Sequence, residues 1–289
     1  MKILNFGSLN LDHVYRLSHI VKEGETISSQ SLEKFCGGKG LNQSIAMCKA
    51  GLDVYHAGGV GEDGAMLTDK LSEYGADVTH VRMTDVPTGH AIIQVDDNGQ
   101  NSIVLFGGAN QSQDKAFIDS VLNDFENGDY LVLQNEINNM PYIIENANKQ
   151  GLFIILNPSP YNSEIEKCDL SKVSMLFINE IEGEQITGKS EPEEIIKEIL
   201  NHYPDMKTVL TLGADGAVYA DKNEYTHQKA LGDVVKDTTA AGDTFLGYFI
   251  AGMTKNMSAK EALLLASKAS AITISKIGAA DTIPTFDEI

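Results

Sequence analysis

Short apolar runs alternate with longer amphipathic stretches along most of the 289-residue chain. Several of the runs are apolar at nearly every position, which is typical of strands buried on both faces of a parallel sheet. They predict strands at residues 2–6, 54–58, 130–134, 153–157, 175–178 and 209–212.

The stretches between these runs have the apolar spacing of helices, and they lie at residues 41–50, 64–74, 113–125, 141–150 and 193–202. Two further helices close the chain. One starts near Gly242 and the other at Ser258, where Glu261 completes a capping box. The alternation predicts an α/β fold with a doubly wound, mainly parallel sheet and helices on both faces, formed by residues 1–289 as one domain.

Two segments, residues 11–36 and 87–106, break this pattern and contain short alternating strands instead of helices. In the second segment, residues 90–95 and 102–106 flank a turn sequence, DNGQ, at residues 97–100. We interpret the two segments as a small β-sheet inserted into the α/β domain. It is either decoration packed on the core or a lid over a site at the sheet edge, and the pattern alone favours neither.

Composition and charge narrow the classes of function. Hydrophobic residues make up 42% of the chain, enough for a substantial core, while the formal net charge is −19. This charge disfavours nucleic acid and anionic membranes as main partners, because both would be repelled over most of the surface. No apolar run approaches the ~18 residues of a membrane span. Three widely spaced cysteines, Cys36, Cys48 and Cys168, predict free thiols and a cytoplasmic protein.

Two well-known motifs match the chain but suit their usual roles poorly. Residues 59–64 read GVGEDG and fit the dinucleotide fingerprint, yet Glu62 and Asp63 would oppose a pyrophosphate. Residues 183–190 read GEQITGKS and fit the Walker A pattern, in which Lys189 and Ser190 would bind phosphate and magnesium. Several glutamates crowd this segment, and four residues separate it from the preceding strand.

A simpler interpretation of residues 183–190 is structural. A short helix over residues 182–187 would end at Gly188, and Ser190 would cap a new helix with Pro192 in its first turn. A P-loop NTPase that uses Lys189 and Ser190 remains the alternative.

The most informative segment is residues 237–245, which read DTTAAGDTF and lead into a helix. Ala240, Ala241 and Gly242 leave backbone amides uncovered at a helix N-terminus, which favours an anion. Asp243 among these amides suits a proton acceptor for a hydroxyl, beside charge that builds on a transferred phosphoryl group. The alternative is a plain acidic residue in the first turn, which leaves the run of small residues unexplained.

A second glycine-rich segment, CGGKGLN at residues 36–42, also precedes a helix. Together, the two segments and their order resemble the PfkB or ribokinase-like family of carbohydrate kinases. The resemblance covers essentially the whole chain and includes further segments at residues 10–12, 87–89, 157–160, 179–182 and 211–216.

The resemblance implies transfer of the γ-phosphoryl group of ATP to a sugar hydroxyl with Mg²⁺. Asp243 would be the catalytic base, and the amides from Ala240 to Asp243 would form an anion hole. Glu182 would position Mg²⁺ through water. The implied nucleotide-binding residues are Asn179, Thr211, Gly213, Asp215, Gly216, Gly242 and Ser267.

The resemblance also implies a sugar site, a lid and a cation site. The sugar would be bound by Asn10, Asp12, Gly38, Lys39, Asn42, Glu136 and Asp243. The inserted strands would close over the sugar, and the lid sheets of two chains would pair in a homodimer. A K⁺ site would involve Asp237, Thr239, Thr273, Lys276, Gly278 and Thr282.

Within the family, Asn10 and Asp12 are similar to the ribokinase pattern, which implies D-ribose as substrate and D-ribose 5-phosphate as product. Fructose, deoxyribose and adenosine remain alternative acceptors, and a non-catalytic sugar sensor is a further alternative. Because ATP must bind to a chain of charge −19, we expect the excess carboxylates to lie mostly on outer helices, away from the site.

Overall fold

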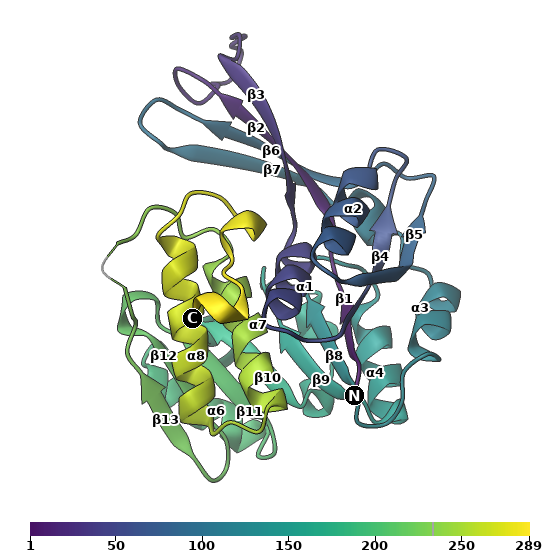
Figure 1. Ribbon diagram of the computed structural model, residues 1–289, viewed down its shortest axis with the longest axis vertical. Helices are drawn as coiled ribbons and strands as arrows, with labels where there is room; N and C mark the ends of the chain where they lie inside the picture. Colours follow the sequence, from purple (N-terminus) through teal and green to yellow (C-terminus); the bar gives the residue numbers. More distant parts are fainter. Residues whose placement is uncertain (233) are drawn as a thin grey trace.

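The computed structural model describes residues 1–232 and 234–289, and these residues form two separate sheets (Figure 1). The larger sheet has nine strands in the order β13-β12-β11-β10-β9-β8-β1-β4-β5. Neighbouring strands run parallel from β11 to β5, whereas β12 is antiparallel to both β11 and β13. The strands are β1 (Ile3–Phe6), β4 (Val54–Val60), β5 (Asp77–Met83), β8 (Tyr130–Gln134), β9 (Phe153–Asn157), β10 (Met175–Asn179), β11 (Lys207–Thr211), β12 (Ala217–Ala220) and β13 (Tyr225–Gln228).

The predicted doubly wound fold is confirmed, and all six predicted strands are present within a few residues of their predicted bounds. The sequence pattern missed β5, β12 and β13. Strands β5 and β13 form the two edges of the sheet and are only partly buried, so they lack a continuous apolar run. Strand β12 is fully buried but has only four residues, too few for a clear signal.

Alternate residues of the strands enter different hydrophobic cores on the two faces of the sheet. Ile3 and Val132 face one core, and Leu4 and Leu133 face the other. The first core packs under α1 (Lys39–Lys49), α2 (Ala65–Glu73), α7 (Ala241–Thr254) and α8 (Ala259–Ile274). The second packs under α3 (Lys115–Leu122), α4 (Met140–Gln150) and α6 (Pro192–His202). Burial on both faces explains why the central strands are so uniformly apolar.

Two helix starts test the capping predictions. The capping box of Ser258 and Glu261 is present at the start of α8, as predicted. Helix α5 (Glu180–Thr187) ends at Gly188, whose φ of 70° is left-handed, also as predicted. The prediction that Ser190 caps the next helix is wrong. The N-cap of α6 is Glu191, without a side-chain capping bond, and Pro192 occupies the first helical position.

The smaller sheet contains β2 (Asn10–Arg16), β3 (Ser31–Gly37), β6 (Gly89–Val95) and β7 (Asn101–Phe106), in the order β3-β2-β6-β7. These strands come from the two segments that were predicted to form an inserted sheet. Figure 1 shows the sheet standing out from the body of the molecule, above one end of the larger sheet. Its parallel β2–β6 pair joins segments that are distant in sequence, with Asn10 opposite Gly89.

Exposed apolar side chains lie on the small sheet, and they are Leu32, Phe35, Ile92, Ile103, Val104, Leu105 and Phe106. Within the described residues, no helix has both the length and the apolar character that a bilayer span requires.

Candidate active site

A cleft of about 1360 Å³ lies between the small sheet and the carboxyl ends of the main-sheet strands. Strand β1 lies between β8 and β4, so the chain winds outward from β1 in both directions. In open α/β sheets, ligands bind outside the carboxyl ends of the strands at such a switch point. Residues that follow β1 and β8, including Asn10, Asp12 and Glu136, line the cleft here.

Most of the residues that the sequence predicts for the site line this one cleft. They are Asn10, Asp12, Gly38, Lys39, Asn42, Glu136, Asn179, Glu182, Thr211, Asp237, Thr239, Ala240, Ala241, Gly242, Asp243 and Gly278. The other predicted residues are not part of the cleft wall, and they are Gly213, Asp215, Gly216, Ser267, Thr273, Lys276 and Thr282. Ser267 is buried, and its hydroxyl has no hydrogen-bond partner among the described residues.

The start of α7 has the form that the anion-hole prediction requires. Ala240 is its N-cap, with a left-handed φ of 61°, and no side chain of the described residues caps this helix end. Helix-start amides lack partners inside the helix, so those of Gly242 and Asp243 are available to an anion. A Cβ on Gly242 would meet nothing within 4 Å, which leaves the amides uncovered.

Asp243 lies in the first turn of α7 and is 8% exposed. Two side chains of α1 donate hydrogen bonds to its carboxylate: Asn42 Nδ2 to Oδ2 at 3.1 Å, and Gln43 Nε2 to Oδ1 at 2.9 Å. The two helices approach closely at Gly247, where an added Cβ would lie 2.6 Å from that of Ala46. The glycine therefore allows α1 to hold the carboxylate.

Lys39, at the start of α1, lines the same cleft as this carboxylate. Its burial lowers the pKa of its ammonium group, but Asp243, Glu136 and Glu182 raise that pKa by more. Lys39 therefore stays charged in the cleft. Its backbone N–H donates to Glu136 Oε2 at 3.0 Å, which fixes the helix start against the loop after β8. The preceding Gly38 has a φ of 97°, a conformation that favours glycine.

Two further carboxyl groups of the cleft, those of Asp12 and Glu136, hold their protons more tightly than usual. Burial and the nearby charge of Glu136 raise the pKa of Asp12 to about 6. Burial also raises the pKa of Glu136, although Lys39 and a hydrogen bond from the Ser8 hydroxyl oppose this. The pair suits hydroxyl groups that both donate and accept hydrogen bonds.

Asn10 is held by a residue that the sequence analysis missed. Asn110 is 2% exposed; its Nδ2 donates to Asn10 Oδ1 at 2.8 Å, and its Oδ1 accepts from the backbone N–H of Leu9 at 2.9 Å.

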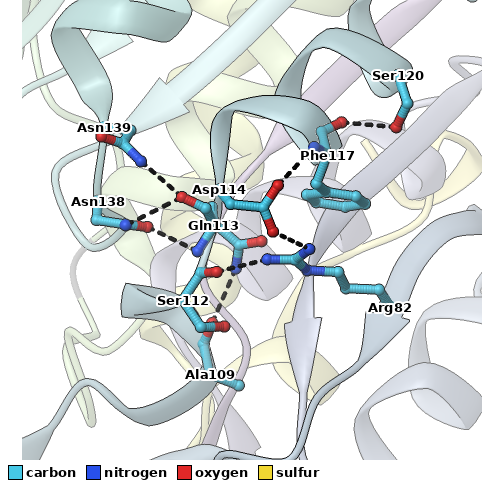
Figure 2. A network of polar contacts seen from close by, with 9 residues as sticks. All are labelled: Arg82, Ala109, Ser112, Gln113, Asp114, Phe117, Ser120, Asn138 and Asn139. Atoms are coloured by element: carbon cyan, nitrogen blue, oxygen red, sulfur yellow. Dashed lines mark hydrogen bonds and ion pairs between the residues drawn. The ribbon is translucent and has the colours of Figure 1, made fainter.

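The segment that carries Asn110 is braced from behind by a polar network (Figure 2). Gln113 N–H donates to Asn138 Oδ1 at 2.9 Å, and Asn138 and Asn139 both donate to the Gln113 carbonyl. Arg82 donates to Asp114 Oδ2 at 2.7 Å and to the Ser112 carbonyl. The network joins the end of the small sheet to the loop that carries Glu136.

Asn179 and Glu182 form a capping box at the start of α5. Glu182 N–H donates to Asn179 Oδ1 at 2.8 Å, and Asn179 N–H donates to Glu182 Oε2 at 3.1 Å. The N-x-x-E motif therefore has a structural role, while its role at the nucleotide and Mg²⁺ stays a prediction. Glu182 is 5% exposed and faces the cleft.

The predicted potassium-site residues fall into two groups. Asp237 accepts hydrogen bonds from Thr239 N–H at 2.9 Å and from Gly278 N–H at 3.0 Å, which joins two loops at the cleft. Burial raises the pKa of Asp237, but a hydrogen bond from the Thr239 hydroxyl at 2.6 Å, together with the two N–H bonds, lowers it by more. The Thr282 hydroxyl bonds the Gly278 and Ala279 carbonyls. Thr273 is fully buried and bonds Thr244 between α8 and α7, and the Lys276 N–H bonds the Thr273 carbonyl.

The two other motif matches do not contribute to this cleft. Lys189 and Ser190 are exposed between α5 and α6 and do not line it. In the GVGEDG segment, Gly61 N–H donates to the Thr88 hydroxyl, and Asp63 Oδ1 accepts from the Thr88 N–H and hydroxyl. These bonds anchor the start of β6 in the small sheet.

The charge of the cleft differs from expectation. Eight carboxylates line it, and they are Asp12, Asp69, Glu73, Glu136, Glu182, Asp237, Asp243 and Asp281. Four basic side chains line it, and they are Arg16, Lys34, Lys39 and Lys70. Acidic groups outnumber basic ones about as strongly here as in the whole chain, 41 to 22. The carboxylates are therefore not depleted at the site, and amides must supply part of any anion binding.

Comparison with known proteins identifies relatives over the whole length. Residues 1–286 match the model of the pfkB family carbohydrate kinases. The chain is 33% identical to a ribokinase from Staphylococcus aureus (strain COL), over 100% of this chain and 98% of that protein. A deoxyribokinase from Salmonella typhi is 27% identical, over 100% of this chain and 97% of its own.

Solved structures give the same result. A ribokinase from Cryptococcus neoformans var. grubii serotype A in complex with ADP superposes with a TM-score of 0.88 and 31% identity, covering 99% of this chain and 98% of its own. An Arabidopsis thaliana ribokinase complexed with ribose and ATP has a TM-score of 0.86 and 28% identity, covering 99% and 96%.

Proposed function

Because the chain belongs to the PfkB family of carbohydrate kinases, we propose that it transfers the γ-phosphoryl group of ATP to the hydroxymethyl group of D-ribose. The observation that carries the proposal is the pairing of a nearly buried carboxylate, Asp243, with open helix-start amides in the same turn of α7. The similarity to ribokinases supports ribose as the acceptor.

In the proposed step, Asp243 accepts the proton of the sugar hydroxyl as its oxygen attacks the γ-phosphorus. The bond between this phosphorus and the bridging oxygen of ATP breaks, and ADP leaves. Within the predicted anion hole from Ala240 to Asp243, the Ala241 N–H donates to the Thr238 carbonyl, so the open amides of Gly242 and Asp243 stabilise the charge on the transferred group. The Lys39 ammonium adds a positive charge beside it. Positioning and charge neutralisation carry most of phosphoryl transfer, so a weak carboxylate base suffices.

The sugar-site proposal assigns Asn10, Asp12, Gly38, Lys39, Asn42 and Glu136 to the ribose hydroxyls. One observation supports it directly: Asn42 Oδ1 is buried and has no hydrogen-bond partner among the described residues. Such an atom is costly unless a ligand group donates to it. Asp12 and Glu136 would accept hydrogen bonds from other hydroxyls of the sugar.

We assign the nucleotide to the open side of α7, with Asn179, Thr211, Gly213, Asp215, Gly216, Gly242 and Ser267 as its contacts. Mg²⁺ takes few protein ligands and keeps water and phosphate oxygens, so the single carboxylate of Glu182 fits it. Bound Mg²⁺ would neutralise phosphate charge. K⁺ would add a fixed positive charge beside the anion hole, held by oxygens of Asp237, Thr239, Thr273, Lys276, Gly278 and Thr282.

We further propose that the small sheet is a lid, that the lid sheets of two chains pair through their exposed apolar residues, and that the enzyme is cytoplasmic. Pairing would cover side chains such as Val104 and Phe106, which are 60% and 47% exposed. Free cysteines fit a reducing compartment.

The decisive experiment is an ADP-release assay with ribose, deoxyribose, fructose and adenosine, applied to wild type, Asp243→Asn and Lys189→Ala. We expect the highest kcat/KM for ribose, a loss of at least ~10³-fold in Asp243→Asn and near-normal activity in Lys189→Ala. No ribose turnover would reject the substrate. The similarity to a deoxyribokinase makes deoxyribose the second candidate. An inactive Lys189→Ala with an active Asp243→Asn would instead support the P-loop interpretation.

A further inference from the structure

Three buried amide side chains form a continuous chain of hydrogen bonds behind Asp243. Gln43 donates to Asp243 Oδ1 at 2.9 Å and accepts from Gln134 Nε2 at 2.7 Å. Gln134 also donates to Asn5 Oδ1 at 2.8 Å. Asn5 Nδ2 donates to the Gly40 carbonyl and to the Ser44 hydroxyl, both at 2.7 Å. We call Asn5, Gln134 and Gln43 the amide chain; none is more than 1% exposed.

The direction of the amide chain is set by a backbone carbonyl. Because the Gly40 carbonyl can only accept, Asn5 must turn its NH₂ toward it and its oxygen toward Gln134. Gln134 then donates with both hydrogens, one to Asn5 and one to the Gln43 oxygen. Gln43 is left with its NH₂ facing Asp243.

A second carbonyl fixes the same direction from the other end. Asn157 Nδ2 donates to the Phe177 carbonyl at 3.0 Å, so its Oδ1 faces Gln43 Nε2 at 3.2 Å. Both hydrogens of the Gln43 amide therefore have acceptors. A flipped Gln43 would place its one oxygen against both the Asp243 carboxylate and Asn157 Oδ1, and its NH₂ against the NH₂ of Gln134.

The amide chain belongs to the frame of the protein rather than to the cleft wall. Asn5 is on β1, Gln134 ends β8 and Gln43 is on α1. None of the three lines the cleft, so none can touch a bound substrate there. Any effect on the reaction must pass through Asp243.

We propose that Asn5, Gln134 and Gln43 are positioning residues that hold the Asp243 carboxylate in one orientation. Through Gln43, they ensure that Asp243 Oδ1 meets an N–H group and not an oxygen. A buried carboxylate whose oxygens accept hydrogen bonds from fixed donors is held in one orientation, so its geometry for accepting a proton is set before the substrate binds. The proposal rests on the proposed role of Asp243 as the base.

The test uses two substitutions of Gln134, which reaches Asp243 only through Gln43. Gln134→Met removes the donor to Gln43, and Gln134→Glu, of equal size, replaces that donor with an acceptor. We expect kcat to fall about tenfold in Gln134→Met and about a hundredfold in Gln134→Glu. KM for sugar and ATP should stay within about twofold. If the role were only packing, the larger change in shape would cause the larger loss.

Gln150→Met is the matched control. Gln150 ends α4 and is partly buried, and its Nε2 donates to the Leu122 and Phe125 carbonyls, outside both the amide chain and the cleft wall. We expect a similar loss of thermal stability with kcat within about twofold of wild type. Gln43→Glu, which turns an oxygen toward the Asp243 carboxylate directly, carries the same prediction as Gln134→Glu should the Gln134 variants not fold.

A double-substitution cycle separates failure of this proposal from failure of the proposed function. Gln134→Met in an Asp243→Ala background should cause no further loss of kcat, because there is no carboxylate left to position. An unchanged kcat in Gln134→Glu, with Asp243→Ala inactive, would overturn the amide chain alone. Full activity in Asp243→Ala would overturn the proposed function.

Discussion

Asn110 donates a 2.8 Å hydrogen bond from its Nδ2 to Oδ1 of Asn10, across 100 residues of sequence. The same side chain pairs with the N–H and the carbonyl of Leu9, so it holds the first residues of β2 on both sides. It thereby connects the small sheet to the braced segment shown in Figure 2. A side chain outside the cleft wall thus fixes one residue of the proposed sugar site.

Asn110→Ala should weaken sugar binding more than nucleotide binding. The substitution leaves the Leu9 N–H and carbonyl without these partners, and an unpaired buried group costs about 1–3 kcal/mol. We expect the KM for ribose to rise at least about tenfold while the KM for ATP stays within about twofold, together with lower stability in urea. Asn148→Ala, at an exposed amide, is the control. An equal rise in both KM values would contradict a local role.

Asp12→Asn should make the protein more stable than the wild type at neutral pH, and this difference should disappear in acid. The folded pKa of Asp12 is about 6, above its ordinary value of 3.8, so the folded state binds the proton more tightly. Ionisation therefore costs the wild type stability as the pH rises from about 4 to 6, up to about 3 kcal/mol above pH 6. Urea unfolding at pH 7.5 should show the variant as more stable, and the difference should vanish near pH 4. Asp85→Asn, at an exposed position, controls for the loss of one negative charge.

His56→Asn should remove part of the acid sensitivity of the fold. His56 is fully buried, and its burial lowers its pKa to about 3, far below its ordinary value of 6.5. The unfolded state therefore binds the extra proton first, and stability is lost as the pH falls from about 6.5 toward 3, on the order of 3–5 kcal/mol in total. Unfolding free energies at pH 7.5, 5.5 and 4.5 should fall less steeply in the variant. Parallel pH curves would show that this histidine is not responsible.

Ser258→Ala should destabilise the protein without changing catalysis. The Ser258 hydroxyl accepts from the Glu261 N–H, and Glu261 Oε2 accepts from the Ser258 N–H at 2.8 Å, at the start of the 16-residue α8. Loss of the cap should cost about 1 kcal/mol, and Ser258→Asp should retain most of it. Thermal unfolding measures the change, and kcat should be unaltered. Equal stability of the alanine and aspartate variants would rule out the cap as the cause.

The parts of the fold that the sequence predicted are those with a local signal. The central strands are apolar because both of their faces are buried, and the start of α7 is marked by its small residues. Strand β13 lies at an edge and is mostly polar, so its own residues show no apolar pattern. Only its pairing with β12 reveals it as a strand.

The same reasoning explains which site residues were missed. Gln43 and Asn110 act through partners about 90 to 200 residues away, which no short motif records. One signal was present in the sequence, because Gln134 and Asn157 are polar residues at the ends of apolar strands that converge on the cleft. The Ser190 cap was wrong because Pro192 takes the first helical position, where its missing N–H needs no partner, and this makes Glu191 the N-cap.

The parallel pairing of β2 with β6 joins two local hairpins of the small sheet across a long stretch of chain. Asn10 meets Gly89, so this pairing cannot close until the 78 residues between these positions have been arranged, including β4, α2 and β5 of the main sheet. Closing so long a loop costs entropy before its contacts form. The hairpins β2–β3 and β6–β7 close much shorter loops, so we expect each of them to form before β2 and β6 pair. The amides that bond β2 to β6 should therefore gain protection from hydrogen exchange after those within the two hairpins.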